Sequence, residues 1–126
     1  STIKQLVQAD KRVKEARVCI LGLTFKENCP DIRNSHAVDV VRGLREFGCD
    51  VDIFDPWAEP EEVEKFYGLK SVKNADVLRF RVYDAVVLAV AHREFTDMDV
   101  TKFCDGNAVV FDIKGSLPRE VVDGRL

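Results

Sequence analysis

The sequence has no long apolar run, no excess of positive charge and no leader pattern. No stretch of its 126 residues approaches the roughly 20 apolar residues of a membrane-spanning helix. The formal net charge is -3, so bulk attraction to nucleic acid or to an anionic membrane is not expected. The first ten residues mix polar and apolar side chains, unlike a signal peptide. We therefore expect a cytoplasmic protein whose anion sites, if it has any, are local.

Paired cysteines are also missing. The four cysteines, at positions 19, 29, 49 and 104, form no C-x-x-C pair, which argues against a zinc site or a redox dithiol. Cys19 and Cys49 lie in or beside apolar runs. Reduced thiols are favoured over disulfides for such a chain, and no metal site is expected.

Several catalytic and cofactor motifs are absent. The G-x-G-x-x-G fingerprint of dinucleotide-binding loops retains only Gly22, and Phe25 and Lys26 stand where a pyrophosphate would need small residues. Asp55 is a possible ribose-binding acid, but an Asp-Pro pair is also an ordinary strand stop. No G-x-S-x-G elbow is present, and no acidic pair of the phosphoacceptor type follows the first apolar run. No catalytic residue is expected in this chain.

What is present is an alternation of apolar runs and helical patterns. With 46% hydrophobic residues, the chain fits one packed domain. Strands are predicted at 16–23, 49–54, 69–72, 83–90 and 108–113, and helices at 1–12, 35–47, 60–67, 99–104 and 118–122. Residues 75–81 fit either a helix or a loop. Continuous apolar strands indicate burial on both faces, so the prediction is an α/β, Rossmann-like three-layer sandwich with a mainly parallel sheet.

The best-marked helix of this pattern begins at Asn34 or Ser35, either of which suits an N-cap. Gly48 closes it at the position after the C-cap. Its predicted apolar stripe consists of Ala37, Val38, Val40, Val41, Leu44 and Phe47.

In an open parallel sheet, ligands bind beyond the carboxyl ends of the strands. Four segments should meet there: 23–35, 55–57, 91–95 and 114–116. The first joins a strand to a helix start, where unpaired N–H groups and the helix dipole favour anions. These segments carry Lys26, Arg33, Arg93 and Lys114.

Each candidate also has a simpler explanation. Lys26 fits either an anion contact or a solvated loop. Arg33 opposes the dipole of the following helix, so it needs a carboxylate or anion partner, and Asp31 is an internal alternative. His92 fits either a ligand contact or a packed loop residue, and Trp57 is best explained as a loop anchor.

The run from Gly22 to Ser35 (GLTFKENCPDIRNS) resembles the start of the C-terminal domain of the UDP-glucose/GDP-mannose dehydrogenase family. Every fixed position of the pattern G-L-x-F-K, then about four residues, then D-x-R-x-S is met. The segments FDP at 54–56 and FDIKG at 111–115 support the resemblance. The sequence of the loop is most similar to that of the bacterial branch that oxidises UDP-N-acetyl-hexosamines for surface polysaccharides.

The resemblance implies specific roles. Phe25 and Lys26 would contact the UDP-sugar, Lys114 would lie near the substrate, and Arg33 would reach the NAD pyrophosphate. The family's catalytic cysteine, its helpers and the NAD glycine loop belong to regions upstream of this sequence. Residues 1–15 would end a helix from a central dimerisation region, and 16–126 would form the UDP-sugar-binding domain, inert by itself.

By the same resemblance, the whole protein would be a homodimer or a higher homo-oligomer that uses NAD as cofactor. The sequence leaves open a second function, a stand-alone nucleotide-binding or interaction module with a degenerate Rossmann site.

Overall fold

The computed structural model describes residues 15–78, 81–97, 104–113 and 124–125. The strands, all paired in parallel, form one sheet in the order β2-β1-β3-β4-β5. Their bounds are β1 Arg17–Leu21, β2 Asp50–Phe54, β3 Tyr83–Leu88, β4 Cys104–Asp112 and β5 Gly124–Arg125. The helical elements are α2 His36–Glu46, α3 Pro60–Tyr67, the 3-10 turn η1 Ala75–Leu78, and α4 Arg93–Asp97. The predicted α/β class with a parallel sheet is confirmed.

The outer edge of β2 carries one further contact, a parallel bridge between Phe54 and Val72. The short strand predicted at 69–72 is present only as this bridge. If Val72 is counted as a strand, the spatial order becomes 3-2-1-4-5-6, the order of dinucleotide-binding folds. The chain reverses direction across the sheet between β1 and β3, so the carboxyl ends of these two strands mark the expected ligand crevice.

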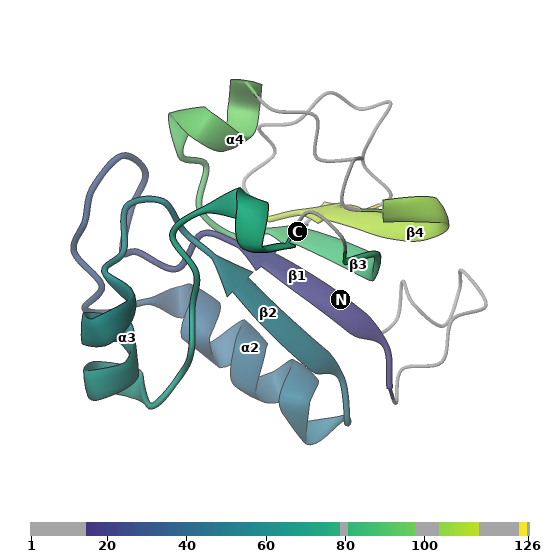
Figure 1. Ribbon diagram of the computed structural model, residues 1–126, viewed down its shortest axis with the longest axis horizontal. Helices are drawn as coiled ribbons and strands as arrows, with labels where there is room; N and C mark the ends of the chain where they lie inside the picture. Colours follow the sequence, from purple (N-terminus) through teal and green to yellow (C-terminus); the bar gives the residue numbers. More distant parts are fainter. Residues whose placement is uncertain (1–14, 79–80, 98–103, 114–123, 126) are drawn as a thin grey trace.

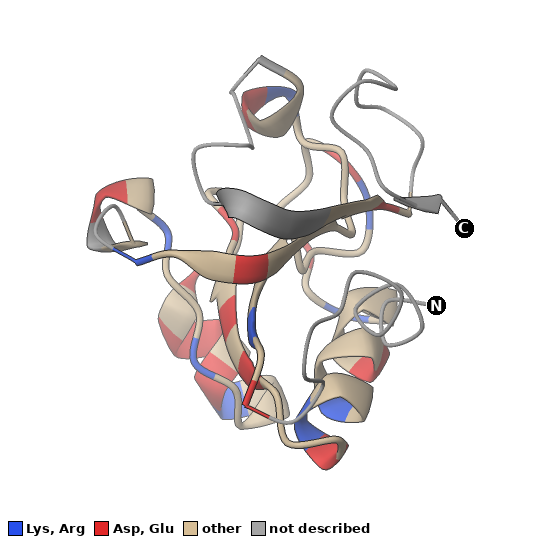
Figure 2. Ribbon diagram, turned by 90° about the vertical axis from the view of Figure 1, so that its right-hand side faces the viewer, with Lys and Arg blue, Asp and Glu red and all other residues tan. Residues whose placement is uncertain are grey.

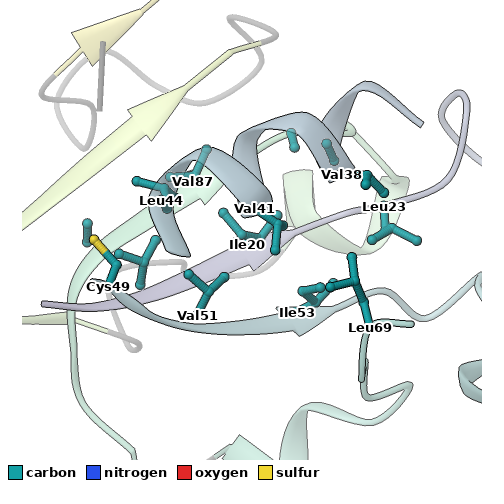
Figure 3. Close-up of a cluster of buried hydrophobic side chains, with 14 of the residues drawn as sticks. Ile20, Leu23, Val38, Val41, Leu44, Cys49, Val51, Ile53, Leu69 and Val87 are labelled. Carbon is teal, nitrogen blue, oxygen red and sulfur yellow. The ribbon is translucent and has the colours of Figure 1, made fainter. Parts of the chain in front are cut away.

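Helical elements cover both faces of the sheet (Figure 1). Successive residues of β1 enter different cores, as the period of a strand requires. Val18 and Ile20 pack in one cluster with α2, and Cys19 and Leu21 pack in the other with Leu78 of η1. Figure 3 shows the α2 side chains Val38, Val41 and Leu44 directed at the sheet.

The residues predicted to bound α2 are confirmed. Ser35 is the N-cap, and its side chain accepts a hydrogen bond from the Val38 N–H. Gly48 follows the C-cap with φ of 90°. Ala37, Val38, Val41 and Leu44 are buried as predicted, and Val40 is partly buried. Phe47 was wrongly assigned to the stripe: it is 57% exposed, because the helix has ended at Glu46 and Phe47 lies in the cap.

Helix α4, at Arg93–Asp97 in the crossover after β3, was not predicted from the sequence. The helix predicted at 99–104 lies outside the described residues except for Cys104, which begins β4 and was therefore wrongly placed in a helix. The apolar Phe95, fully buried against Phe54 and His92, holds the helix close to the end of β3. The ambiguous segment 75–81 contains the short turn η1. The elements predicted at 1–12 and 118–122 lie outside the described residues.

Candidate functional site

Three of the four expected segments meet at the carboxyl ends of β1, β2 and β3. Their meeting point is the carboxylate of Asp55, which is fully buried directly after β2. Its Oδ2 accepts hydrogen bonds from the backbone N–H groups of Leu23, at 2.6 Å, and Thr24, at 3.0 Å. Its Oδ1 accepts from the Trp57 N–H at 2.7 Å. Nε2 of His92 lies 3.0 Å from Oδ2. Lys114, in the fourth segment, lies outside the described residues.

This arrangement keeps Asp55 ionised. Burial by itself would raise the pKa of the carboxyl group, but the hydrogen bonds from His92, Leu23 and Trp57 outweigh it and hold the pKa below its ordinary value. Both oxygens are committed to groups of the chain itself. Asp55 is therefore not available to a ribose, and the possible role as a ribose-binding acid is wrong.

The same carboxylate decides what the loop after β1 can bind. In dinucleotide-binding folds, the N–H groups of this loop face a pyrophosphate. Here the N–H groups of Leu23 and Thr24 point at Asp55. Gly22, with φ of 97°, brings the loop against Val90, where a Cβ would lie 2.6 Å from the Val90 Cβ. The first turn of the loop is thus closed by an internal anion, and an external anion must bind farther along.

The rest of the loop folds back on itself. The Phe25 N–H donates to the Asp31 carbonyl at 2.7 Å, and the Thr24 hydroxyl donates to the Lys26 carbonyl at 3.0 Å. Asn28 and Asn34 have positive φ values of 54° and 57°, which asparagine tolerates better than most residues. These contacts give residues 23–35 a defined shape and leave the side chains of Phe25 and Lys26 exposed.

A cavity of about 610 Å³ lies where this loop enters α2. Its volume falls within the ~300–1,000 Å³ common for small-molecule sites. The predicted residues Phe25 and Arg33 line it, whereas Lys26 does not. The other lining residues are Asp31, Asn34, Ser35, Val38, Asp39, Arg42, Phe66 and Tyr67.

Tyr67, at the end of α3, fixes one wall of the cavity. Its hydroxyl donates to the Ile32 carbonyl at 2.5 Å and accepts from the Ser35 N–H at 3.2 Å. The neighbouring Phe66 is 60% exposed and lines the same cavity. Helix α3 thus holds the end of the loop in place and adds an aromatic surface beside Phe25.

Arg33 pairs with Asp31, the internal partner that the sequence suggested as an alternative to a ligand. Its Nε and one terminal nitrogen donate to the two oxygens of Asp31 at 3.0 and 3.1 Å. The Arg33 guanidinium holds the pKa of Asp31 below its ordinary value. The Arg33 side chain is 72% exposed, and an ion pair in water contributes little stability. The guanidinium can therefore exchange this carboxylate for another anion at small cost.

Trp57 is a loop anchor, as its position suggested. Its indole N–H donates to Glu94 at 2.9 Å, and the Arg93 guanidinium lies 5.1 Å from the centre of its ring. The ring also stacks with His92 at 5.9 Å. Arg93, expected to face a ligand, instead packs on Trp57 and ties the segment after β2 to α4.

Charged residues of both signs are interspersed over the ribbon in Figure 2. Within the described ranges, no helix is long and apolar enough to cross a bilayer. The same part of the chain contains no group of three or more His, Cys, Asp or Glu residues placed to hold a metal ion. Cys19, Cys29 and Cys49 form no disulfide within the described residues.

Sequence reasoning missed three residues that shape the site: Thr24, Asn28 and Tyr67. Thr24 and Asn28 lie inside the motif but at its variable positions, so the pattern gave them no weight. Tyr67 ends a helix that is distant in the sequence, and no local signal connected it with Ser35. The one available hint was Asn28 itself, because asparagine often occupies turn positions with positive φ.

Taken together, fold and site define a Rossmann-type α/β domain with a nucleotide-sized cavity at the carboxyl edge of its sheet. Residues 19–119 match the UDP binding domain of the UDP-glucose/GDP-mannose dehydrogenase family. The chain belongs to this family, as its loop motif predicted.

Curated relatives support the same branch of the family. The chain is 43% identical to the UDP-N-acetyl-D-glucosamine 6-dehydrogenase of Salmonella typhi, covering 98% of this chain and 29% of the relative. It is 40% identical to the enzyme of the same name from Pseudomonas aeruginosa, again over 98% of this chain and 29% of the relative. The chain thus spans less than a third of the length of these relatives.

Solved structures agree on the fold. An NDP-N-acetyl-D-galactosaminuronic acid dehydrogenase from Methanosarcina mazei superposes with a TM-score of 0.83 at 19% identity, over 98% of this chain and 27% of that one. A UDP-glucose dehydrogenase from Pyrobaculum islandicum gives a TM-score of 0.75 at 26% identity, over 98% of this chain and 27% of that one.

Proposed function

We propose that this chain is the UDP-sugar-binding domain of an NAD-dependent UDP-sugar 6-dehydrogenase. The substrate would be UDP-N-acetylglucosamine or UDP-N-acetylgalactosamine, and the product a UDP-uronic acid for bacterial surface polysaccharide. Family membership and the names of the most similar curated relatives support this proposal. The reaction would take place in the cytoplasm, on residues that this chain does not contribute.

The observation that carries the proposal is the shared cavity of Phe25, Arg33 and the start of α2. Phe25 is 45% exposed at its wall and offers an apolar face to a base or sugar ring. Ser35 and Val38 mark the helix N-terminus, whose dipole favours a diphosphate. Lys26, exposed on the same loop, would supply a mobile positive charge to phosphate or sugar from outside the cavity.

The described residues do not form the main binding site for NAD. The loop N–H groups that would hold its pyrophosphate are bonded to Asp55. Among the described residues, we assign Arg33 alone, which lines the cavity, to the cofactor. We therefore assign the principal NAD site to another domain of a longer protein, in which residues 1–15 end a connecting helix and 16–126 form the C-terminal domain. Lys114 remains a proposed substrate contact, and a homodimer or higher oligomer remains the proposed assembly.

The test is a titration of the isotope-labelled chain with UDP, followed by amide NMR. One or two charge-assisted hydrogen bonds, each worth about 1.5–3 kcal/mol, predict only weak binding in the millimolar range. Shifts should concentrate in residues 23–35 and in the first turn of α2. Lys26→Ala should weaken binding about tenfold, whereas Lys70→Ala, an exposed lysine after α3, should not.

Two controls sharpen this experiment. Uridine tests whether phosphate is needed, because the proposal expects weaker binding without it. NAD should shift residues around Arg33 only. Equal binding of UDP by both lysine variants would contradict the role of Lys26, and absence of any UDP shift would contradict binding by this chain alone.

A further inference from the structure

His92 is a fully buried histidine with both ring nitrogens engaged. Its Nε2 lies 3.0 Å from Asp55 Oδ2 and 3.1 Å from the Thr24 hydroxyl oxygen. Its Nδ1 lies 2.8 Å from the backbone nitrogen of Asn28. The side chain thus connects the end of β3 with the ends of β1 and β2.

The partners determine which nitrogen carries the proton. The Asn28 backbone N–H can only donate, so Nδ1 must accept and be unprotonated. The Asp55 carboxylate can only accept, so Nε2 must carry hydrogen. The Thr24 hydroxyl already donates to the Lys26 carbonyl, which leaves its oxygen free to accept from Nε2 as well. The contacts are satisfied together only by the neutral Nε2–H tautomer.

This tautomer fastens the loop on both sides of Lys26. Two residues before Lys26, Thr24 contacts Nε2; two residues after it, Asn28 bonds to Nδ1. Asn28 makes a second contact with the same segment, since its Oδ1 accepts from the Arg93 N–H at 2.9 Å. The positive φ of Asn28, 54°, is thereby held in place, and with it the direction in which the loop turns.

We propose that His92, as the neutral Nε2–H tautomer, is a positioning residue that sets the conformation of the loop from Thr24 to Asn28 and so places Lys26 for the diphosphate of the nucleotide. The role in binding rests on the proposed function, because it needs Lys26 to contact UDP. The role in loop conformation rests only on the hydrogen bonds described above.

The direct test is the tautomer itself. The ¹⁵N shifts of the His92 ring in the labelled 126-residue chain at pH 7 should show an unprotonated Nδ1 and a protonated Nε2. The Asn28 amide proton should be protected from exchange. A protonated Nδ1, or an unprotected Asn28 amide, would overturn the proposal whether or not UDP binds.

Two substitutions test the consequence for binding. His92→Phe keeps an aromatic ring against Trp57 and Phe95 but removes the hydrogen bonds of both ring nitrogens. It should expose the Asn28 amide to exchange and weaken UDP binding about tenfold, the loss expected when one charge-assisted contact is misplaced. His92→Gln offers an NH₂ donor group and a carbonyl acceptor on one carbon, so it should keep Asn28 protected and bind UDP within about twofold of the wild type.

A double variant distinguishes the positioning of Lys26 by His92 from a general destabilisation of the loop. If His92 acts through Lys26, adding His92→Phe to Lys26→Ala should weaken UDP binding little further. Fully additive losses, or a folded His92→Phe chain with unchanged UDP affinity, would overturn the positioning role. If the wild-type chain shows no UDP binding at all, the proposed function and the binding role fail together, while the tautomer and the Asn28 amide still decide the conformational role.

Discussion

The Asp55 carboxylate and the His92 imidazole, both fully buried, lie 3.0 Å apart at the carboxyl ends of β2 and β3. Asp55 accepts from the backbone N–H groups of Leu23 and Thr24, and His92 accepts from that of Asn28, in the loop that follows β1. A buried pair of this kind replaces an external ligand at the place where related folds hold a phosphate. These internal hydrogen bonds hold the loop motif in its conformation, and the predictions below follow from that.

Asp55→Asn should lower the free energy of unfolding by about 3 kcal/mol, because an amide cannot accept from every donor that faces the carboxylate. Urea denaturation of the chain measures the loss. Asp50→Asn is the matched control: Asp50 begins β2, the strand that Asp55 follows, is exposed, and its substitution should change stability little. Similar losses in the two variants would contradict the central role of Asp55.

The stability contributed by Asp55 should depend on pH with a defined sign. Because the folded state lowers the pKa of Asp55, its contribution is complete above the ordinary carboxyl pKa of about 3.9 and is lost as the pH falls through the folded-state value. The difference in the free energy of unfolding between wild type and Asp55→Asn should be constant from about pH 7 to about pH 5. It should narrow below about pH 4. A difference that stays the same down to acid pH would contradict the lowered pKa.

Alanine at two glycines should act in opposite directions. Gly22→Ala should destabilise the chain by about 2–4 kcal/mol, since its Cβ would collide with Val90 and φ is 97°. Gly43→Ala, within α2, meets no atom within 4 Å and should stabilise the helix by about 0.5–1 kcal/mol. Thermal unfolding of both variants provides the comparison. A tolerated Gly22→Ala would show that the loop does not approach β3 so closely.

Tyr67→Phe should loosen the end of the loop before α2. Losing the hydroxyl leaves the Ile32 carbonyl and the Ser35 N–H without their partner and should cost about 1–2 kcal/mol. Amide exchange at Ser35 should quicken in this variant. Tyr83→Phe is the control, because its hydroxyl bonds to Asp52 in β2 and not to this loop. It should lower the stability of the whole chain, and amide exchange at Ser35 should quicken only as much as global unfolding does.

Arg33→Ala should leave folding nearly unchanged, within about 1 kcal/mol, because its pair with Asp31 is exposed. In the full-length dehydrogenase that we propose, it should raise KM for NAD and leave KM for the UDP-sugar nearly unchanged. Arg45→Ala, exposed in the last turn of α2, controls for loss of charge. An effect on the UDP-sugar rather than on NAD would reassign Arg33 to the substrate side of the cavity.

Much of the fold could be predicted because its signals are local. The apolar runs located β1, β2 and β3, the cap at Ser35 and the glycine at position 48 bounded α2, and the loop motif identified the family. Helix α4 was not predicted because a single buried aromatic, Phe95, sets its position, and a helix of five residues has too little periodicity to recognise.

The sequence by itself determined that a strand, a basic loop and a capped helix follow one another, and that these residues resemble a UDP-binding domain. Tertiary structure alone decided what the loop bonds to. Asp55 lies 31 or 32 residues from its donors in the loop after β1, and His92 lies 68 residues from Thr24. These groups meet only because β1 pairs with both β2 and β3. Such contacts depend on the order of strands in the sheet, and no local spacing encodes that order.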